Sequence, residues 1–128
     1  MSLRSKDKRN FITSFKDCLH GFEFVIVNED NFKREIILGI IALILSFILK
    51  VSAIEFIIIL FVIALVLICE VINTAIEKTV DLYTKEYNET AKIAKDVSAF
   101  SVLLTCFFAV VIGIVIFVPK IINLLGGI

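Results

Sequence analysis

Three apolar segments limit what this chain can fold into. The first runs from Ile36 to Ile54 and is interrupted near its end by Lys50 and Ser52; the second is uncharged from 56 to 69, and the third from 97 to 118. A helix needs about 20 apolar residues to cross a bilayer. Of the 128 residues 59% are hydrophobic, against about 45–50% apolar residues in soluble domains. The sequence therefore predicts an all-α membrane protein with a single domain, residues 1–128, and transmembrane helices at about 33–54, 56–84 and 91–118.

The residues before the first apolar segment have a different pattern. Apolar side chains recur there at spacings of three and four, with polar residues such as Lys16 and His20 between them. This periodicity predicts an amphipathic helix at about 5–30 that is too polar to span a membrane. Its aromatic face and nearby basic residues are typical of a helix that lies on the membrane surface.

The distribution of Lys and Arg predicts the orientation. Seven lie in residues 1–35 and four lie between Lys78 and Lys95, whereas the turn after the first apolar segment and the C-terminal end hold one each. The positive-inside rule then places the N-terminus and the second connection in the cytoplasm and the C-terminus outside. The formal net charge is zero, so no overall basic field indicates a nucleic-acid partner.

Four polar residues follow the second apolar run in the stretch "LICEVINTAIEKTVD". At about 100° per residue, Glu70, Asn73, Glu77 and Asp81 share one helix face about 80° wide. A carboxylate inside a bilayer costs at least ~2.5 kcal/mol, and three on one face repel each other. Either a divalent cation binds Glu77 and another acid while the deeper Glu70 acts as a general base, or the face merely crosses the interface, with Glu77 and Asp81 in water and Glu70 paired to a Lys.

A second polar cluster lies in the predicted cytoplasmic connection, "YTKEYNETAKIAKD". Lys95 is a point charge of the kind that binds phosphates, and Asp96 would orient it or take part in metal binding. The alternative is a solvated helical hairpin without chemistry. No P-loop and no G-x-G-x-x-G motif is present, so phosphate chemistry would need another scaffold.

Intramembrane acids also occur along ion paths, so a small proton-linked transporter is an alternative, as is an inactive membrane scaffold. A pore needs polar lining residues through the whole bilayer. Residues 56–69 and 107–118 contain no hydroxyl, amide or charge. The polar groups stop at the depth of the cytoplasmic interface, which favours chemistry there over passage across the membrane.

Three motifs carry a resemblance to a known family. The stretches "CEVINTAIEKTVD", "EYNETAKIAKDVSA" and "NEDNFKRE" resemble the small bacterial integral-membrane diacylglycerol kinases and undecaprenol kinases, from about Phe11 to Phe117. The start, "SFKDCLHGFEFVIVNEDNF", is similar to the Gram-positive, undecaprenol kinase-like branch. The resemblance implies a multi-pass lipid kinase of the bacterial cell membrane, with a surface helix, three membrane helices and a homotrimer with shared active sites.

The family's reaction is the transfer of the γ-phosphate of ATP to a lipid alcohol at the cytoplasmic interface, with Mg²⁺. The resemblance implies undecaprenol as preferred acceptor, giving undecaprenyl phosphate, and diacylglycerol, giving phosphatidic acid, as the alternative. It makes Glu70 the general base and Glu29 and Glu77 the residues that hold Mg²⁺ on the phosphates. The positions that match nucleotide contacts are Lys95, Asp96, Glu86, Tyr87 and Asn88.

Four more positions complete the comparison with the family's motifs. Asn73 and Asp81 match positions that support the site. Asp17 stands at a nucleotide-binding position where the family usually has an aromatic residue, and Phe100 stands where Gly or Ala is frequent. These two departures bear on the contact with adenine and on helix packing, and they leave the three site glutamates in place.

Overall fold

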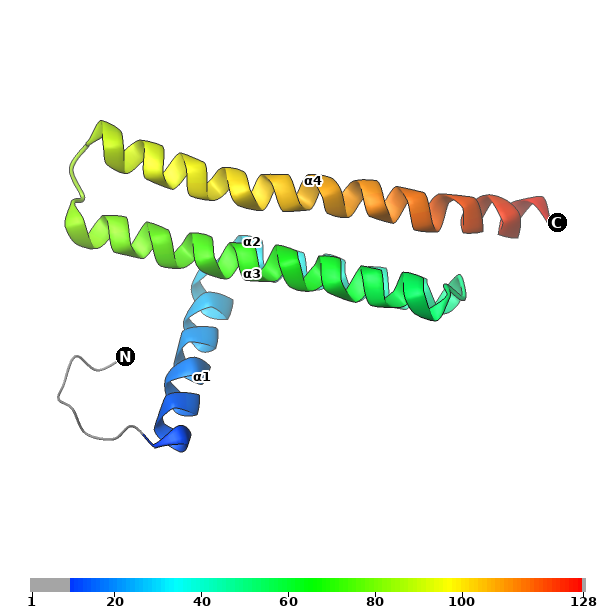
Figure 1. Ribbon diagram of the computed structural model, residues 1–128, viewed down its shortest axis with the longest axis horizontal. Helices are drawn as coiled ribbons and strands as arrows, with labels where there is room; N and C mark the ends of the chain where they lie inside the picture. Colours follow the sequence, from blue (N-terminus) through cyan, green and yellow to red (C-terminus); the bar gives the residue numbers. More distant parts are fainter. Residues whose placement is uncertain (1–9, 128) are drawn as a thin grey trace.

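The computed structural model describes residues 10–127, which form four α-helices joined by short connections (Figure 1). The helices are α1 (Phe11–Asn28), α2 (Asp30–Ile48), α3 (Ala53–Tyr83) and α4 (Glu89–Gly126). The chain is therefore all-helical, as expected. Residues 5–9 of the predicted surface helix lie outside the described residues.

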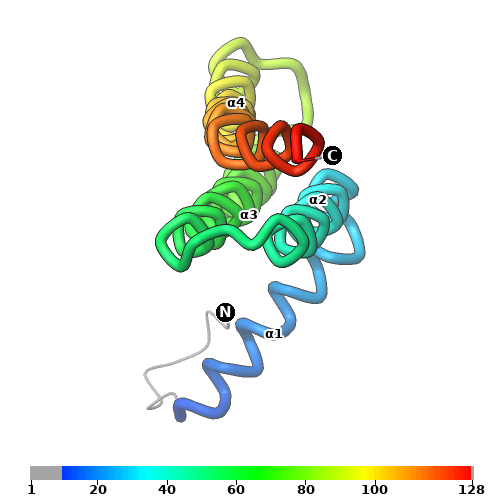
Figure 2. The backbone as a smooth tube through the Cα atoms, turned by 90° about the vertical axis from the view of Figure 1, so that its right-hand side faces the viewer, coloured from blue at the N-terminus to red at the C-terminus, as the bar shows by residue number. Residues whose placement is uncertain are grey.

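Helix α3 is the centre of the bundle. It packs against both α2 and α4, whereas α2 and α4 make few contacts with each other. The three helices run alongside one another, with α1 leaving the bundle at the start of α2 (Figures 1 and 2). Because α2 and α4 both pack against α3 but make few contacts with each other, space remains between them.

The few buried side chains of this bundle are as often polar as hydrophobic, unlike those of a soluble protein. Within residues 10–127 the buried hydrophobic residues are Val25, Phe32, Ile59, Val66 and Ile116, and the buried polar ones are Ser46, Glu70, Asn73, Thr74 and Ser98. Large apolar side chains instead cover the outside, such as Phe61 and Leu103, each 65% exposed. An apolar exterior of this extent suits a lipid environment.

Two of the four helices, α3 and α4, are long and apolar enough to cross a membrane. Helix α2 does not meet the same criterion because Lys33, Arg34 and Glu35 lie in its first half. The third crossing that the sequence predicts at about 33–54 therefore stays a prediction.

The turn between α2 and α3 comes earlier than the apolar pattern suggested. Helix α2 ends at Ile48, and Lys50 adopts a left-handed conformation with φ 49°. Ser52 and Glu55 then form a capping box: the Ser52 hydroxyl accepts from the Glu55 amide at 3.2 Å, and the Glu55 carboxylate accepts from the Ser52 amide at 2.7 Å. This reciprocal cap satisfies two free donors and sets the start of α3.

Helix α4 differs most from its predicted bounds. The sequence predicts its end at about 118, just before Pro119, yet the helix continues through this proline to Gly126. Proline removes one donor from the backbone ladder, and membrane helices tolerate it where neighbouring helices, Ser or Thr side chains, waters or small local adjustments satisfy the freed backbone group. Lys120 next to it forms an ion pair with Glu55 at 2.9 Å, which joins the end of α4 to the start of α3.

A sharp elbow joins α1 to α2. Its corner is Glu29, the one non-helical residue between the two helices, with φ −107° and ψ 103°. The Lys33 ammonium bridges the corner, since it donates to the Val27 carbonyl and to the Asp30 carboxylate, each at 3.0 Å. The elbow therefore fixes Glu29 where the surface helix meets the bundle.

Candidate active site

Glu70 is the most deeply buried acid of the bundle, with 2% of its surface exposed. Asn73 and Thr74 on the next turn of α3 and Ser98 on α4 are also buried. The Asn73 Oδ1, Thr74 Oγ1 and Ser98 Oγ atoms are buried and have no hydrogen-bond partner in the part of the chain that the structure describes. Among the described residues no Lys or Arg forms an ion pair with Glu70. The alternative in which a Lys neutralises Glu70 therefore has no support within the described residues.

Two further acids lie near Glu70. Glu29 at the elbow and Glu77, two turns further along α3, are both close enough for their charges to act on Glu70. Glu77 is half-buried and accepts a hydrogen bond from the Asn73 side-chain amide at 3.4 Å. The structure thus brings together Glu29 and Glu77, which are far apart in sequence, around one buried carboxylate.

This arrangement suits a metal ion that is shared with a substrate. In the described residues no group of three acidic, His or Cys side chains forms a ready metal site. Mg²⁺ is commonly held by only one or two carboxylates together with substrate phosphates. Glu29 and Glu77 offer the hard oxygen donors that such a shared ion requires.

Lys95 has a different partner from the one expected. Its ammonium forms an ion pair with Asp81 of α3, and both side chains are little more than a third exposed. Asp96, which the sequence suggested as the residue that orients Lys95, instead pairs with Lys92 at 2.7 Å. The reason is helical geometry, since Lys92 and Asp96 are four residues apart on one face and adjacent residues point apart.

The other predicted nucleotide positions lie at the α3–α4 connection and on α1. Tyr87 is exposed, and Glu86 donates its backbone amide to the Thr84 hydroxyl at 3.2 Å. The Asn88 side chain caps α4 by accepting from the Ala91 amide at 2.9 Å. Asp17 is half-buried in the middle of α1. The helix cap is the role that the structure gives Asn88, and contacts of these residues with a nucleotide stay predictions.

Glu35 is a site residue that the sequence analysis missed. The Glu70 carboxylate is close enough for its charge to act on Glu35, and one Glu35 carboxylate oxygen is buried with no hydrogen-bond partner among the described residues. In sequence it directly follows the basic residues Lys33 and Arg34. A signal was present, because Glu35 lies three residues after Phe32 and four before Gly39, and both of these are buried. Residues at these spacings share a helix face.

Comparison with known proteins identifies the family. Residues 16–117 match the model of the prokaryotic diacylglycerol kinases. The chain is 38% identical to the undecaprenol kinase of Bacillus subtilis, over 91% of this chain and 98% of that protein. It is 32% identical to a diacylglycerol kinase of Synechocystis, over 91% of this chain and 67% of that protein, and 33% identical to that of Escherichia coli K12, over 71% and 75%. This chain belongs to the prokaryotic diacylglycerol kinase family.

As a member of this family the protein is a membrane lipid kinase, and its similarity to the Bacillus protein supports the Gram-positive, undecaprenol kinase-like branch. The four acids described above therefore belong to a membrane lipid kinase. Three of these acids, Glu35, Glu70 and Glu77, lie on α2 and α3 inside the bundle, and Glu29 lies at its edge.

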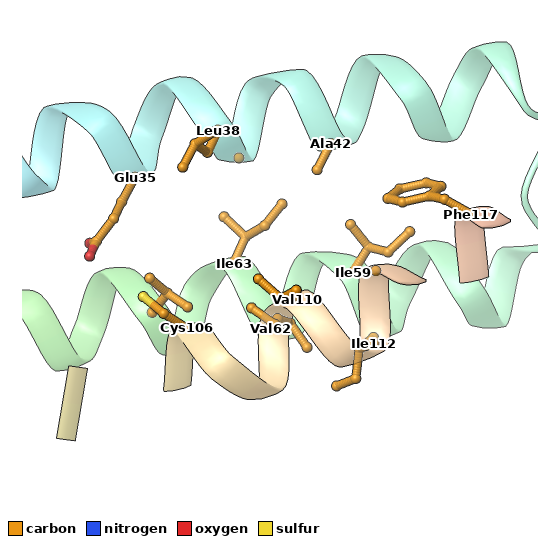
Figure 3. Close-up of a pocket in the computed structure, with 14 residues that line it drawn as sticks. Glu35, Leu38, Ala42, Ile59, Val62, Ile63, Cys106, Val110, Ile112 and Phe117 are labelled. Atoms are coloured by element: carbon orange, nitrogen blue, oxygen red, sulfur yellow. The ribbon is translucent and has the colours of Figure 1, made fainter. Parts of the chain in front are cut away.

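An apolar groove leads away from the acids of this lipid kinase. It has a volume of about 290 Å³ and lies between α2, α3 and α4, where α2 and α4 do not meet. Glu35 and Cys106 lie at one end, and Ile59 and Phe117 at the other (Figure 3). Glu35 is the only charged residue among those that line it. The groove thus joins the acid cluster to the apolar part of the bundle.

Proposed function

We propose that the protein transfers the γ-phosphoryl group of ATP to the hydroxyl of a membrane lipid, with undecaprenol as preferred acceptor. The observation that carries this proposal is Glu70, a buried carboxylate that has no cationic partner within residues 10–127, with Glu29 and Glu77 near it. A buried carboxylate of this kind needs a proton donor, and a lipid alcohol brings one. Family membership supports the lipid kinase reaction, and the similarity to the Bacillus undecaprenol kinase supports the choice of acceptor.

In the proposed reaction Glu70 accepts the proton of the lipid hydroxyl while the hydroxyl oxygen attacks the γ-phosphorus of ATP. The bond from the γ-phosphorus to the bridging oxygen breaks, and ADP leaves with that oxygen. Phosphoryl transfer depends mainly on positioning and on stabilising the charge of the phosphates. Mg²⁺ held by Glu29 and Glu77 would neutralise part of that charge.

The remaining site residues would bind the nucleotide or hold another site residue in place. Lys95 faces the site from α4, held by Asp81, and would contact a phosphate as a point charge. Asn73 donates to Glu77 and so supports that carboxylate. We assign contacts with the nucleotide also to five other positions that match the family: Asp17, Glu86, Tyr87, Asn88 and Asp96.

The membrane arrangement is part of the proposal. We place α1 on the cytoplasmic surface, let α2, α3 and α4 cross the membrane and put the C-terminus outside, as the distribution of Lys and Arg predicts. We further propose a homotrimer with shared sites. The buried Asn73, Thr74 and Ser98 atoms, which lack a hydrogen-bond partner among the described residues, support a site that needs further groups.

The test is transfer of radiolabelled phosphate from ATP by purified protein in mixed micelles, with undecaprenol and diacylglycerol offered separately and with Mg²⁺ present or removed. We expect label mainly on undecaprenol and none without Mg²⁺. Label mainly on diacylglycerol would keep the mechanism and overturn the acceptor. No label on either lipid at saturating ATP and Mg²⁺ would favour the inactive scaffold.

A further inference from the structure

We propose that Asn31 positions the base: its side-chain amide donates a hydrogen bond to the Glu70 carboxylate and fixes the orientation in which Glu70 meets the lipid alcohol. This inference rests on the proposed function and concerns that same site. It adds a positioning residue to the site, since within the stretch "NEDNFKRE" the family resemblance gives a role to Glu29 alone.

Asn31 lies level with Glu70 along the bundle. Helices α2 and α3 run antiparallel (Figure 2) and approach closely at Gly39, where a Cβ would lie 3.0 Å from the Ile63 side chain. Asn31 is eight residues before Gly39, or about 12 Å along α2. Glu70 is seven residues after Ile63, or about 10 Å along α3. The antiparallel packing therefore brings Asn31 and Glu70 to the same height.

Asn31 also lies on the face of α2 that is turned to Glu70. Glu35 follows it by four residues, about one helical turn, and residues at this spacing share a face. Glu35 and Glu70 are close enough for their charges to interact. The Asn31 side chain itself acts on the Glu70 carboxylate as a hydrogen-bond partner. Height, helix face and contact thus agree for this pair of residues.

Arg34 sets the direction of this hydrogen bond. Its guanidinium donates to the Asn31 Oδ1 atom at 3.5 Å. A guanidinium can only donate and an ionised carboxylate can only accept, whereas an asparagine amide does both. With its oxygen turned to Arg34, Asn31 has its NH₂ group left for Glu70. Asn31 therefore fits between these two side chains in one orientation.

A fixed carboxylate is what a general base requires. One Glu70 oxygen accepts from Asn31, so the other oxygen is left for the proton of the lipid hydroxyl. A base must lie within hydrogen-bond reach of the proton that it takes, and a small displacement of a reacting group costs much of the rate. Within the described residues the charges that act on Glu70 belong to other acids, which repel it. A neutral donor holds the carboxylate in place without bringing a cation to the base.

Three substitutions of Asn31 test this role. The residue is exposed, so a change there leaves no buried cavity. Asn31→Ala removes the donor, Asn31→Asp replaces it with a charged acceptor of the same shape, and Asn31→Gln keeps a donor on a longer side chain. The assay is transfer of radiolabelled phosphate from ATP to undecaprenol in mixed micelles, with kcat and the KM values for lipid and ATP measured separately.

We expect kcat to fall at least about tenfold in Asn31→Ala, to fall further in Asn31→Asp and to be partly restored in Asn31→Gln. Both KM values should stay within about twofold of wild type. Asn28→Asp is the matched control: Asn28 donates to the Phe24 carbonyl at 2.8 Å within α1, and its substitution adds the same charge near the elbow without loss of kcat. Wild-type kcat in Asn31→Ala, or an Asn31→Asp variant as active as Asn31→Gln, would overturn the inference.

A double-mutant cycle shows whether Asn31 acts through the base. In the Glu70→Gln background the further change Asn31→Ala should alter kcat by less than about twofold, because a positioning residue loses its effect once the group that it positions is gone. The same loss of kcat in both backgrounds would mean that Asn31 acts on the substrate itself, which would overturn its role as a positioning residue.

A spectroscopic measurement tests the contact without the reaction. In protein labelled with ¹⁵N at asparagine only, the side-chain amide signal of Asn31 is the one that is lost in Asn31→Ala. We expect this signal to shift in Glu70→Gln and to stay in place in Glu55→Gln, which changes the other end of α3. An unmoved signal in Glu70→Gln would overturn the contact. A shifted signal in a protein that phosphorylates neither lipid would overturn the proposed function and leave the contact standing.

Discussion

Glu70→Gln is the substitution that tests the proposed chemistry most directly. The side chain is 2% exposed and has no cationic partner among the described residues. Glutamine has the same shape, so the change leaves no cavity. It also removes a buried charge that is costly to keep. We therefore expect the variant to fold with at least wild-type stability, which separates loss of chemistry from loss of structure.

The expected loss of rate follows from the role of a general base. Such a group contributes about 10²- to 10⁴-fold to a reaction, which corresponds to about 2.7–5.4 kcal/mol of the activation barrier. The loss should lie in kcat for undecaprenol phosphorylation at saturating ATP and Mg²⁺. The KM for ATP should stay near its wild-type value, because the proposed nucleotide contacts are other residues.

The assay is transfer of radiolabelled phosphate in mixed micelles, with thermal unfolding measured on the same samples. Glu55→Gln is the matched control, since Glu55 lies at the opposite end of α3 and pairs with Lys120 at 2.9 Å. It should keep wild-type kcat. A Glu70→Gln variant that is folded and keeps kcat within about threefold of wild type would refute Glu70 as the base.

Three other substitutions test separate parts of the site and the fold. Glu77→Gln should raise the Mg²⁺ concentration for half-maximal rate at least about tenfold, measured by titration with Mg²⁺ at fixed ATP, because it removes one of two proposed carboxylate ligands. Asp81→Asn should raise the KM for ATP about fivefold and leave stability close to that of the wild type, because the pair with Lys95 is more than a third exposed and screened by water; an unchanged KM would remove Asp81 as a support of the nucleotide site. Gly39→Val should destabilise the bundle by about 1–3 kcal/mol in a chemical unfolding experiment, since its Cβ would lie 3.0 Å from a side chain of α3, whereas the nearest atom to a Cβ at Gly113 is at 3.9 Å and Gly113→Val should cost less.

The face of α3 that carries the acids could be predicted from the sequence because it depends only on helix periodicity. Glu70 and Asn73 are buried, and Glu77 and Asp81 are half-buried on the same face, while Ile72 on the other side is exposed. The roles of these residues could be taken only from the resemblance to the family, because four polar side chains on one face fit several functions.

Two features of the site depend on packing and could not be found by counting along the chain. Glu35 on α2 lies close enough to Glu70 on α3 for their charges to interact, and Gly39 lets the two helices approach closely. Lys95 meets Asp81 across the α3–α4 pair, fourteen residues away in sequence. The groove exists because two helices contact a third without filling the space between them, and no local pattern in the sequence contains that information.

Helix α3 carries all of its acids on one unbroken rod of 31 residues, about 46 Å long, whereas the hydrocarbon core of a bilayer is about 30 Å thick. In the proposed orientation the rod exceeds the membrane, and the eleven residue steps from Glu70 to Asp81 span about 16 Å of depth. Hydrophobic mismatch would then move every acid together, at a cost of a fraction of a kcal/mol per Å. The depth of Glu70, and with it the turnover number, should therefore pass through a maximum as the acyl chains of the host lipid are lengthened.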